Sequence, residues 1–370
     1  MKTTQELHSE HVERIRKAIA LEKTDRTPCV IMADAFCANH MGAKMSEFCM
    51  SAKYSNEIML RSAKELGLFD GMSGTYVYAP MFSMGFLSKV KVAGKELPEG
   101  SLWQIDEQGL MTTEDYDTIL EKGWSAFRDD FYVNRLNIDL DELHRQLEYE
   151  PIANQNFIDA GYAIYYGVFG GNSIDYLSGG RSISKFMMDL RRMPDKVEAV
   201  LDVIVAEEIE SLKFQFSFCE TPPLTGWLST ARGSSDYYSP KMWERFVWKT
   251  LKKLIDTINE NGSAANVHMD GMWERDLDYF REVPKGELVC ELDSTTNIYK
   301  VKEKLGDIAC VKGDVPPAML ALASVDEVYN YSTKLIKELG NGFILSSGCS
   351  VPPNAKVENV KAMIAAASGK

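Results

Sequence analysis

Short apolar runs alternate along the chain with longer amphipathic segments, and the alternation is clearest in the last third. Four apolar runs each lead directly to polar residues: 264–267 before His268, 288–290 before Glu291, 308–311 before Lys312, and 342–345 before Ser346. Segments of helical length, rich in Glu and Lys, separate these runs. Short apolar strands that alternate with amphipathic helices predict βαβ units and a parallel sheet.

The same alternation extends toward the start of the chain. Residues 6–21 have the apolar spacing of a helix, and residues 29–32 form the first expected strand. Further strands are expected at 163–169 and 224–228, and a helix opens at Ser239-Pro240. The number of expected strands is close to eight, so the pattern predicts an α/β fold of the TIM (β/α)8 barrel class, with N-terminal helices.

Residues 88–123 have a different pattern. Residues 90–98 alternate and then turn, and residues 102–105 alternate again, which predicts an inserted β-hairpin followed by a helix at 113–122. An insertion of this kind on a barrel face commonly covers the substrate. No repeat, low-complexity tract or linker divides the chain, so we expect residues 1–370 to form a single domain.

Polar residues at the expected strand ends are the candidates for catalysis and metal binding. In a barrel the carboxyl ends of all strands meet on one face, where the loops build the active site. The residues expected to converge there are His268, Asp270, Glu291, Asp314 and Cys349. Imidazole, carboxylate and thiolate are all groups that can bind a metal ion.

Composition and charge narrow the class of protein. The chain has 370 residues, 45% of them hydrophobic and 26% charged, which is typical of a globular protein. Its formal net charge of −13 argues against a nucleic-acid surface. The sequence shows no signal peptide and no membrane-spanning run, and its seven cysteines form no close-spaced framework. We therefore expect a cytoplasmic protein with reduced thiols and no membrane partner.

Three segments carry a resemblance to a known family. They are residues 14–18 with 25–28, Asp236 with Ser239-Pro240, and residues 342–363, which contain the run 342–349 and the prolines at 352 and 353. These segments resemble the uroporphyrinogen decarboxylase superfamily, in particular its cobalamin-dependent methyltransferase branch. The similarity extends over nearly the whole chain and is strongest after about residue 234. It implies a TIM barrel with N-terminal helices, in agreement with the pattern above.

The resemblance also distinguishes two activities within the superfamily. Uroporphyrinogen decarboxylases carry an arginine-rich motif after the first strand, whereas residues 33–40 contain no arginine here. The methyltransferase branch binds zinc through a His-x-Cys pair and a later cysteine, which His268 and Cys349 match. Asp270 stands where the first of those cysteines would be. The resemblance therefore implies a zinc site of His268, Asp270 and Cys349, with Glu291 as a further catalytic group or a partner of the imidazole.

A carboxylate in place of a thiolate makes the zinc a better Lewis acid, suited to polarising an ether oxygen. The methyl acceptor would be the Co(I) corrinoid (cobamide) of a partner protein, because no Asp-x-His-x-x-Gly corrinoid motif occurs in the chain. An aromatic methyl ether suits the aromatic residues expected near the mouth. The substrate-binding candidates are Asp70, Tyr76, Tyr78, Phe82, Tyr165, Tyr166 and Asp236.

Other interpretations stay open at this point. The enzyme could pass a methyl group from methylcobamide to a thiol or folate, or it could be a lyase acting on a smaller carboxylated substrate. A scaffold without activity is a third alternative. His268 could be a structural residue, Cys349 an inert loop cysteine, Asp70 a turn residue, and the aromatic cluster at 76–86 part of the core. The oligomeric state is open, with a homodimer as one alternative.

Overall fold

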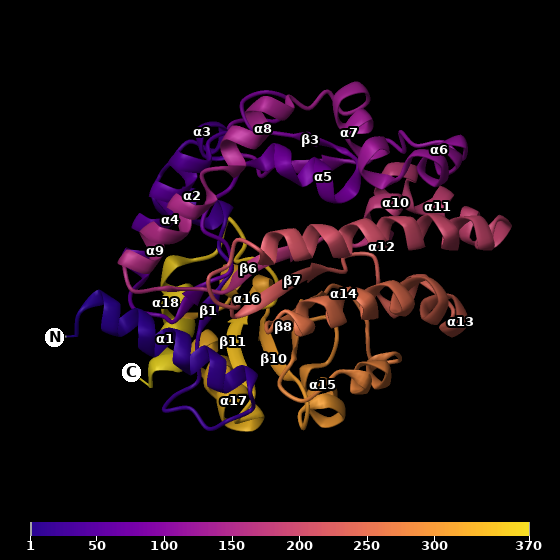
Figure 1. Ribbon diagram of the computed structural model, residues 1–370. Helices are drawn as coiled ribbons and strands as arrows, with labels where there is room; N and C mark the ends of the chain where they lie inside the picture. The colour runs from indigo at the N-terminus through magenta and orange to yellow at the C-terminus, as the bar shows by residue number, and fades with distance from the viewer. Residues whose placement is uncertain (1, 370) are drawn as a thin grey trace.

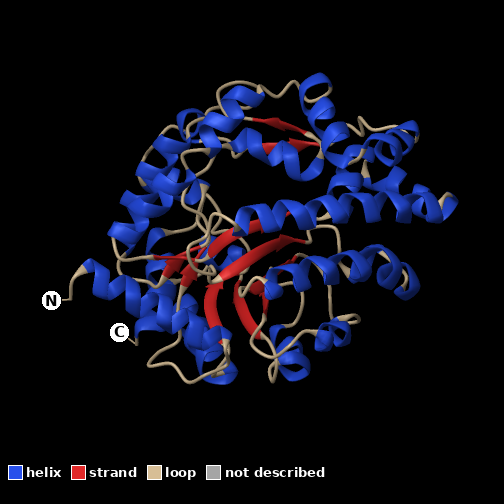
Figure 2. Ribbon diagram, in the orientation of Figure 1, coloured by secondary structure: helices blue, strands red, loops and turns tan. Residues whose placement is uncertain are grey.

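The computed structural model describes residues 2–369 and contains a ring of parallel strands surrounded by helices (Figures 1 and 2). The strands of the ring are β1 (Val30–Ile31), β2 (Gly71–Met72), β5 (Ala163–Ile164), β6 (Tyr166–Gly170), β7 (Thr225–Ser229), β8 (Ala264–Met269), β9 (Leu288–Leu292), β10 (Cys310–Val315) and β11 (Phe343–Ser347). All of their pairings are parallel.

The strands close into a barrel through two short connections. One sheet has the order β1-β2-β5 and the other the order β11-β10-β9-β8-β7-β6. Only Tyr165 separates β5 from β6, so these two are halves of one strand. At the other junction Cys29 bridges Leu345 in parallel, and the backbone N–H of Leu345 donates to the carbonyl oxygen of Pro28 at 2.9 Å. The predicted TIM barrel is therefore confirmed.

Helices cover the outside of the barrel, and their apolar faces form the main core. The longer ones are α1 (Thr4–Ile19), α4 (Ala52–Leu66), α10 (Ser173–Arg181), α11 (Ile183–Arg192), α12 (Pro194–Phe216), α14 (Lys249–Glu260), α15 (Ile298–Leu305), α17 (Val325–Leu339) and α18 (Val357–Ser368). Shorter segments are α2 (Ala35–His40), α3 (Met45–Phe48), η2 (Ser235–Tyr237), α13 (Pro240–Met242), η3 (Trp243–Trp248), η4 (Leu277–Glu282) and α16 (Pro317–Leu322).

Helix α1 closes the amino end of the barrel. It begins at a capping box in which Thr3 accepts from the backbone N–H of Glu6, while the Glu6 side chain accepts from the backbone N–H of Thr3. Its apolar face, including Ile15 and Ile19, packs in one buried cluster with inward-facing strand residues such as Val289. Helix α1 thus covers the amino end of the barrel, and the candidate ligands lie at the other, carboxyl end.

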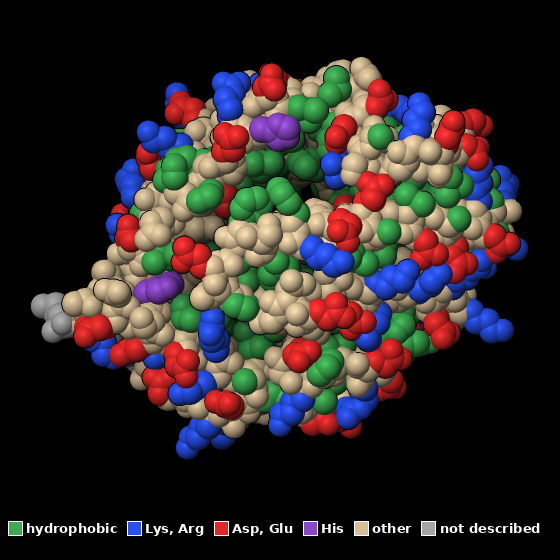
Figure 3. Space-filling view, in the orientation of Figure 1, with side chains coloured by type: hydrophobic (Ala, Val, Ile, Leu, Met, Phe, Trp, Pro, Cys, Tyr) green, Lys and Arg blue, Asp and Glu red, His purple; other side chains and the backbone are tan. Residues whose placement is uncertain are grey.

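A lobe inserted between β2 and β5 lies on the side of the carboxyl end. It consists of η1 (Ala79–Met81), α5 (Phe82–Phe86), β3 (Lys89–Lys91), β4 (Gln104–Asp106), α6 (Glu114–Lys122), α7 (Trp124–Asn134), α8 (Leu140–Leu147) and α9 (Glu150–Asp159). Strands β3 and β4 form the predicted antiparallel hairpin, with Lys89 opposite Asp106. Arg232, after β7, binds Glu107 of the lobe at 2.5 Å. Figure 3 shows a hollow beneath the helices of the lobe, bordered by hydrophobic side chains.

Within residues 2–369, no helix combines the length and the apolar character needed to cross a bilayer.

Candidate functional site

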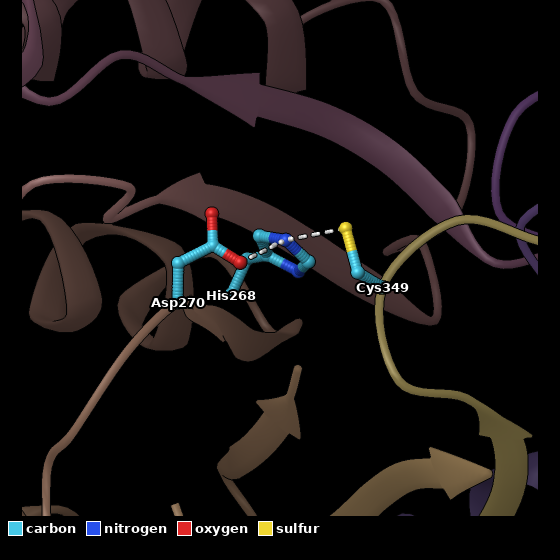
Figure 4. Close-up of side chains that lie close together, drawn as sticks. All are labelled: His268, Asp270 and Cys349. Atoms are coloured by element: carbon cyan, nitrogen blue, oxygen red, sulfur yellow. Dashed lines mark hydrogen bonds and ion pairs between the residues drawn. The ribbon is translucent and has the colours of Figure 1, made fainter. Parts of the chain in front are cut away.

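The three predicted metal ligands lie together at the carboxyl end of the barrel (Figure 4). His268 is the next-to-last residue of β8, Asp270 follows that strand, and Cys349 lies just beyond β11. One ligand atom from each residue lies within 4.8 Å of the others. Nε2 of His268 is 3.3 Å from Oδ1 of Asp270 and 3.7 Å from Sγ of Cys349. The fold therefore brings an imidazole, a carboxylate and a thiol to one point.

The two nitrogens of the His268 ring have different neighbours. Nε2 faces Asp270 and Cys349, whereas Nδ1 is buried, 3.7 Å from Oε2 of Glu291, and no described residue accepts its hydrogen bond. Burial opposes protonation of the ring, but Asp270, Cys349 and Glu291 outweigh burial and raise the pKa of His268 well above its ordinary value. This surplus of acidic groups around one imidazole favours a cation at the site.

The backbone holds Cys349 in an uncommon conformation. Its φ angle of 68° lies in the left-handed region, which costs a residue other than glycine roughly 1–2 kcal/mol. The hydroxyl of Ser347 donates to the carbonyl oxygen of Cys349 at 2.6 Å and so supports the turn. Backbone outliers of this kind are concentrated at functional sites. Here the turn points a half-buried thiol at His268.

Beneath His268 lies a buried network of polar side chains. Glu291 is its centre: Nζ of Lys312 is 2.6 Å from Oε1, the hydroxyl of Tyr166 lies 2.7 and 2.5 Å from the two oxygens, and Nδ2 of Asn266 donates to Oε2 at 2.5 Å. Although burial opposes ionisation, Lys312 and His268 lower the pKa of Glu291 far below its ordinary value. Glu291 is therefore a carboxylate with one side turned to the imidazole.

The residues present fit a zinc ion by the chemistry of their donors. Catalytic zinc sites use three protein ligands of nitrogen, oxygen or sulfur and keep a position for substrate or water. His268, Asp270 and Cys349 are such a set, close enough together to share one ion. A metal-ligating histidine usually has a carboxylate or carbonyl on its other nitrogen, and Glu291 occupies that place. The strained turn at Cys349 is accounted for by such a centre.

Of the predicted substrate residues, Tyr165 and Tyr166 lie inside the barrel. Both are buried: Tyr166 contacts Glu291, and the hydroxyl of Tyr165 donates to Oδ1 of Asn266 at 3.0 Å. They support the site from below. Asp236 is exposed on η2, after β7, and its carboxylate lies beside Gly271, the residue that follows Asp270. Asp236 is therefore on the rim of the site.

The remaining aromatic candidates belong to the loop and lobe that follow β2. Phe82 stacks on Trp103 of the hairpin with ring centroids 5.5 Å apart. Tyr76 and Tyr78 precede η1, and Tyr78 is only 5% exposed. Burial, followed by nearby carboxylates of the lobe, raises the pKa of both tyrosines. These side chains build the lobe, and no described contact joins them to His268, Asp270 or Cys349.

Asp70 lies at the opposite end of the barrel from the site. Strand β2 begins only at Gly71, so Asp70 precedes the strand and sits at its amino end. It is fully buried, and its carboxylate binds Arg14, Arg26 at 2.7 and 2.9 Å, and the backbone N–H of Cys29 at 2.8 Å. With its acceptors occupied in this way, Asp70 ties α1 to the barrel instead of contacting a substrate.

Asp314 was expected to converge with the other strand-end residues, and the structure turns it elsewhere. Its carboxylate faces the helix α17, where the hydroxyl of Tyr331 lies 3.4 Å from Oδ1. Burial raises the pKa of Asp314 to about 7. The side chain thus packs between the barrel and its helices. It does not belong to the ligand trio, the group formed by His268, Asp270 and Cys349.

Three residues that the sequence pattern did not single out line the site. Lys312, an interior strand residue, pairs with Glu291. Trp227 of β7 is half-buried, with its ring centroid 6.0 Å from that of His268 and its indole N–H unpaired among the described residues. Phe169 of β6 is 41% exposed and lies 6.2 Å from Trp227. An aromatic residue in a strand is ordinarily a core residue, so only the register of neighbouring strands could have placed Trp227 beside His268 and Phe169 beside Trp227.

A TIM barrel with a candidate metal centre at its carboxyl end is therefore the class of protein that the fold and site define. The sequence model of the family described as uroporphyrinogen decarboxylase (URO-D) matches residues 174–369, more than half of the chain. The chain belongs to this family. The match contains β7 to β11 and therefore all three candidate ligands.

A comparison with solved structures adds to the description of the fold. A methyltransferase from Methanosarcina mazei superimposes with a TM-score of 0.68 at 17% sequence identity, over 97% of this chain and 98% of that one. At this identity the likeness shows a shared fold across the whole chain, including the N-terminal part outside the family match. No curated protein matches the sequence.

Proposed function

We propose that this protein is a zinc-dependent methyltransferase that moves a methyl group from a methoxylated small molecule to the Co(I) corrinoid of a partner protein. The observation that carries the proposal is the meeting of His268, Asp270 and Cys349 within 4.8 Å at the carboxyl end of the barrel. A structural relative described as a methyltransferase supports the reaction class. The absence of arginine from residues 33–40 disfavours a substrate with many carboxylates, such as a porphyrinogen.

The three ligands differ in softness, and this favours an oxygen-bearing methyl donor. Zinc, when bound, would supply Lewis-acid polarisation of the donor's oxygen, which makes the attached methyl carbon electrophilic. Cys349 contributes a single soft thiolate, while Asp270 contributes a hard carboxylate. A mixed set of this kind is less suited to activating a thiol than a set with two thiolates.

Aromatic side chains beside the ligands favour an aryl methyl ether as the donor. Phe169, Trp227 and His268 form a row of neighbouring rings with centroids 6.2 and 6.0 Å apart. Phe169 is 41% exposed, so this row is accessible to a small flat molecule. Aromatic pairs at these spacings contribute about 0.5–1.5 kcal/mol beyond simple burial.

The acceptor would reach the site from outside, since the chain lacks a corrinoid-binding motif. The lobe between β2 and β5 covers the carboxyl end of the barrel and is joined to the rim by the ion pair of Arg232 and Glu107. A small donor would enter beneath the lobe, at the hollow visible in Figure 3. The corrinoid of the partner would then approach the same methyl carbon, and the demethylated alcohol or phenol would leave by the same route.

The test combines metal analysis with a methyl-transfer assay. The purified protein is expected to hold about one zinc per chain, and mixing it with Co(I) cobalamin and an aryl methyl ether should replace the Co(I) absorbance by that of methyl-Co(III). His268→Ala should lose both the zinc and the reaction, whereas His144→Ala, at an exposed position of α8, should keep both. A metal-free wild-type protein would refute the proposal. Reaction of only methyl-Co(III) with a thiol would reverse the proposed direction.

A further inference from the structure

Lys312 is a charged residue buried in the centre of the barrel, where no solvent reaches it. Its side chain is 0% exposed, and that of its ion-pair partner Glu291 is 2% exposed. A lysine in such a position is costly unless its ammonium group is fully paired. Nζ lies 2.6 Å from Oε1 of Glu291, 3.1 Å from Oγ of Ser73 and 3.3 Å from the hydroxyl of Tyr166. The ring of Tyr165 faces the same ammonium at 4.6 Å.

Glu291 is held just as completely from its own side. Lys312 and Tyr166 contact Oε1, and Tyr166 and Asn266 contact Oε2. The amide of Asn266 is itself oriented, because its Oδ1 accepts from the hydroxyl of Tyr165 and its Nδ2 is thereby turned toward Glu291. The carboxylate is fixed by donors on β8 and β10, the two strands beside β9, and by a donor on the more distant strand β6.

Because its carboxylate is fixed in this way, Glu291 can contact the imidazole of His268 above it but is not free to move to the candidate ligands. Its Oε2 is 3.7 Å from Nδ1 of His268. The ligand trio gathers on the other side of that ring, at Nε2. Without these donors the carboxylate of Glu291 would be free to rotate past the edge of the imidazole and to compete for a place among the ligands of a cation. A carboxylate held by an ammonium, a phenol and an amide would not.

We infer that Lys312 is a positioning residue that keeps Glu291 directed at the imidazole of His268 and out of the metal's ligand set. This inference rests on the metal centre of the proposed function. Its consequence is that three side chains, not four, bind the ion, so that the remaining position is kept for the methyl donor. An outer-shell partner of a metal ligand changes metal affinity or activity by about 10- to 100-fold when it is removed.

The inference can be tested without any activity measurement, by replacing zinc with Co(II). Four-coordinate Co(II) absorbs visible light more strongly than five-coordinate Co(II), and an added small anion such as azide reports an accessible position. The Co(II) wild-type protein should absorb strongly and respond to azide. Lys312→Met should free Glu291 to bind the metal, which should lower the visible absorbance and weaken azide binding about tenfold.

The double variant Glu291→Gln/Lys312→Met is the matched control, since it removes both charges and leaves no carboxylate to compete. It should restore the strong absorbance and the azide response. A Lys312→Met spectrum and azide affinity equal to wild type would overturn the inference.

If Lys312→Met yields too little folded protein, Tyr166→Phe removes one donor to Glu291 while the ion pair remains. That variant should shift both readings in the same direction by a smaller amount, and an unchanged azide affinity there would equally overturn the inference.

The two proposals fail in different ways. A wild-type protein that binds neither zinc nor Co(II) at the trio refutes the metal centre itself. A wild-type protein that binds the metal, with variants that leave its spectrum unchanged, refutes only the role of Lys312.

Discussion

The thiol of Cys349 lies 3.7 Å from Nε2 of His268, the ring nitrogen that also faces Asp270. Cys349 reaches this position through a left-handed turn with φ of 68°. Nothing in the packing of an inert loop cysteine calls for such a conformation, whereas a metal ligand gains from the direction that the turn gives its sulfur. The metal centre proposed above would explain both the strain and the convergence.

The strain at Cys349 can be measured through stability. Cys349→Gly should be more stable than Cys349→Ala by about 1 kcal/mol in the metal-free state, because only glycine relieves the left-handed backbone. Both variants remove the thiol, so the difference between them isolates the backbone. Chemical denaturation in the presence of a chelator gives the two free energies of unfolding. Equal stabilities would mean that the turn is unstrained.

The convergence itself was predictable from sequence, because it follows from strand ends alone. His268, Asp270 and Cys349 all follow apolar runs, and parallel strands in a barrel end on one face. Lys312 could not be recognised, since a lysine after an apolar run is ordinarily the first solvated residue. Its partner Glu291 lies on a neighbouring strand, 21 positions away, and only the register of β9 and β10 shows the pair.

Two other assignments depended on details that the sequence pattern does not carry. Whether Asp70 lies at the mouth or at the base of the barrel depends on where a two-residue strand begins, and β2 begins one position after it. Asp314 follows an apolar run as His268 does, yet its side chain points outward to Tyr331. The positions of the strand ends were therefore predictable from the sequence, whereas the direction in which each side chain points was not.

The role of Asp70 as a structural residue gives a second prediction. Asp70→Asn should lower the free energy of unfolding by about 3–5 kcal/mol, since it leaves the guanidinium groups of Arg14 and Arg26 without their buried counter-charge. Asp25→Asn is the matched control: Asp25 also binds Arg14, but its side chain is 67% exposed, so the loss should be about 0–1 kcal/mol. Denaturant unfolding measures both, and the zinc content of folded Asp70→Asn should equal that of wild type. A loss of zinc from the folded variant would place Asp70 in the site after all.

Asp314 should make stability depend on pH. Its pKa is raised by burial from 3.8 to about 7 in the folded protein. Between these values the unfolded chain has already lost the proton that the folded protein retains, so stability falls as the pH rises from about 4 to about 7 and then levels off. The total effect is on the order of 4 kcal/mol or less.

Replacement of Asp314 by Asn removes this titration and keeps a neutral side chain of the same shape. The variant should therefore be relatively more stable than wild type at pH 8 than at pH 4, with a flatter profile between them. Denaturant unfolding at several pH values gives the profile, with Asp117→Asn, at a side chain that is 65% exposed, as the control. An unaltered slope in Asp314→Asn would show that this carboxyl is ionised throughout the range.

The substitution Asp270→Cys tests the role of Asp270, which stands where the resembled methyltransferases have the cysteine of their His-x-Cys pair. If Asp270 is a ligand, the variant exchanges a hard oxygen for a soft thiolate on the same metal, and zinc should be held more tightly. In the Co(II) protein the near-ultraviolet band from thiolate to metal should grow, because a second sulfur joins Cys349. The same change should weaken reaction with ethers, since a metal with two thiolates is a poorer Lewis acid toward oxygen.

Asp270→Asn is the control that removes the negative charge without adding sulfur, and it should weaken zinc binding. A thiolate band of unchanged intensity in Asp270→Cys would show that residue 270 only orients His268, whose Nε2 it approaches to 3.3 Å.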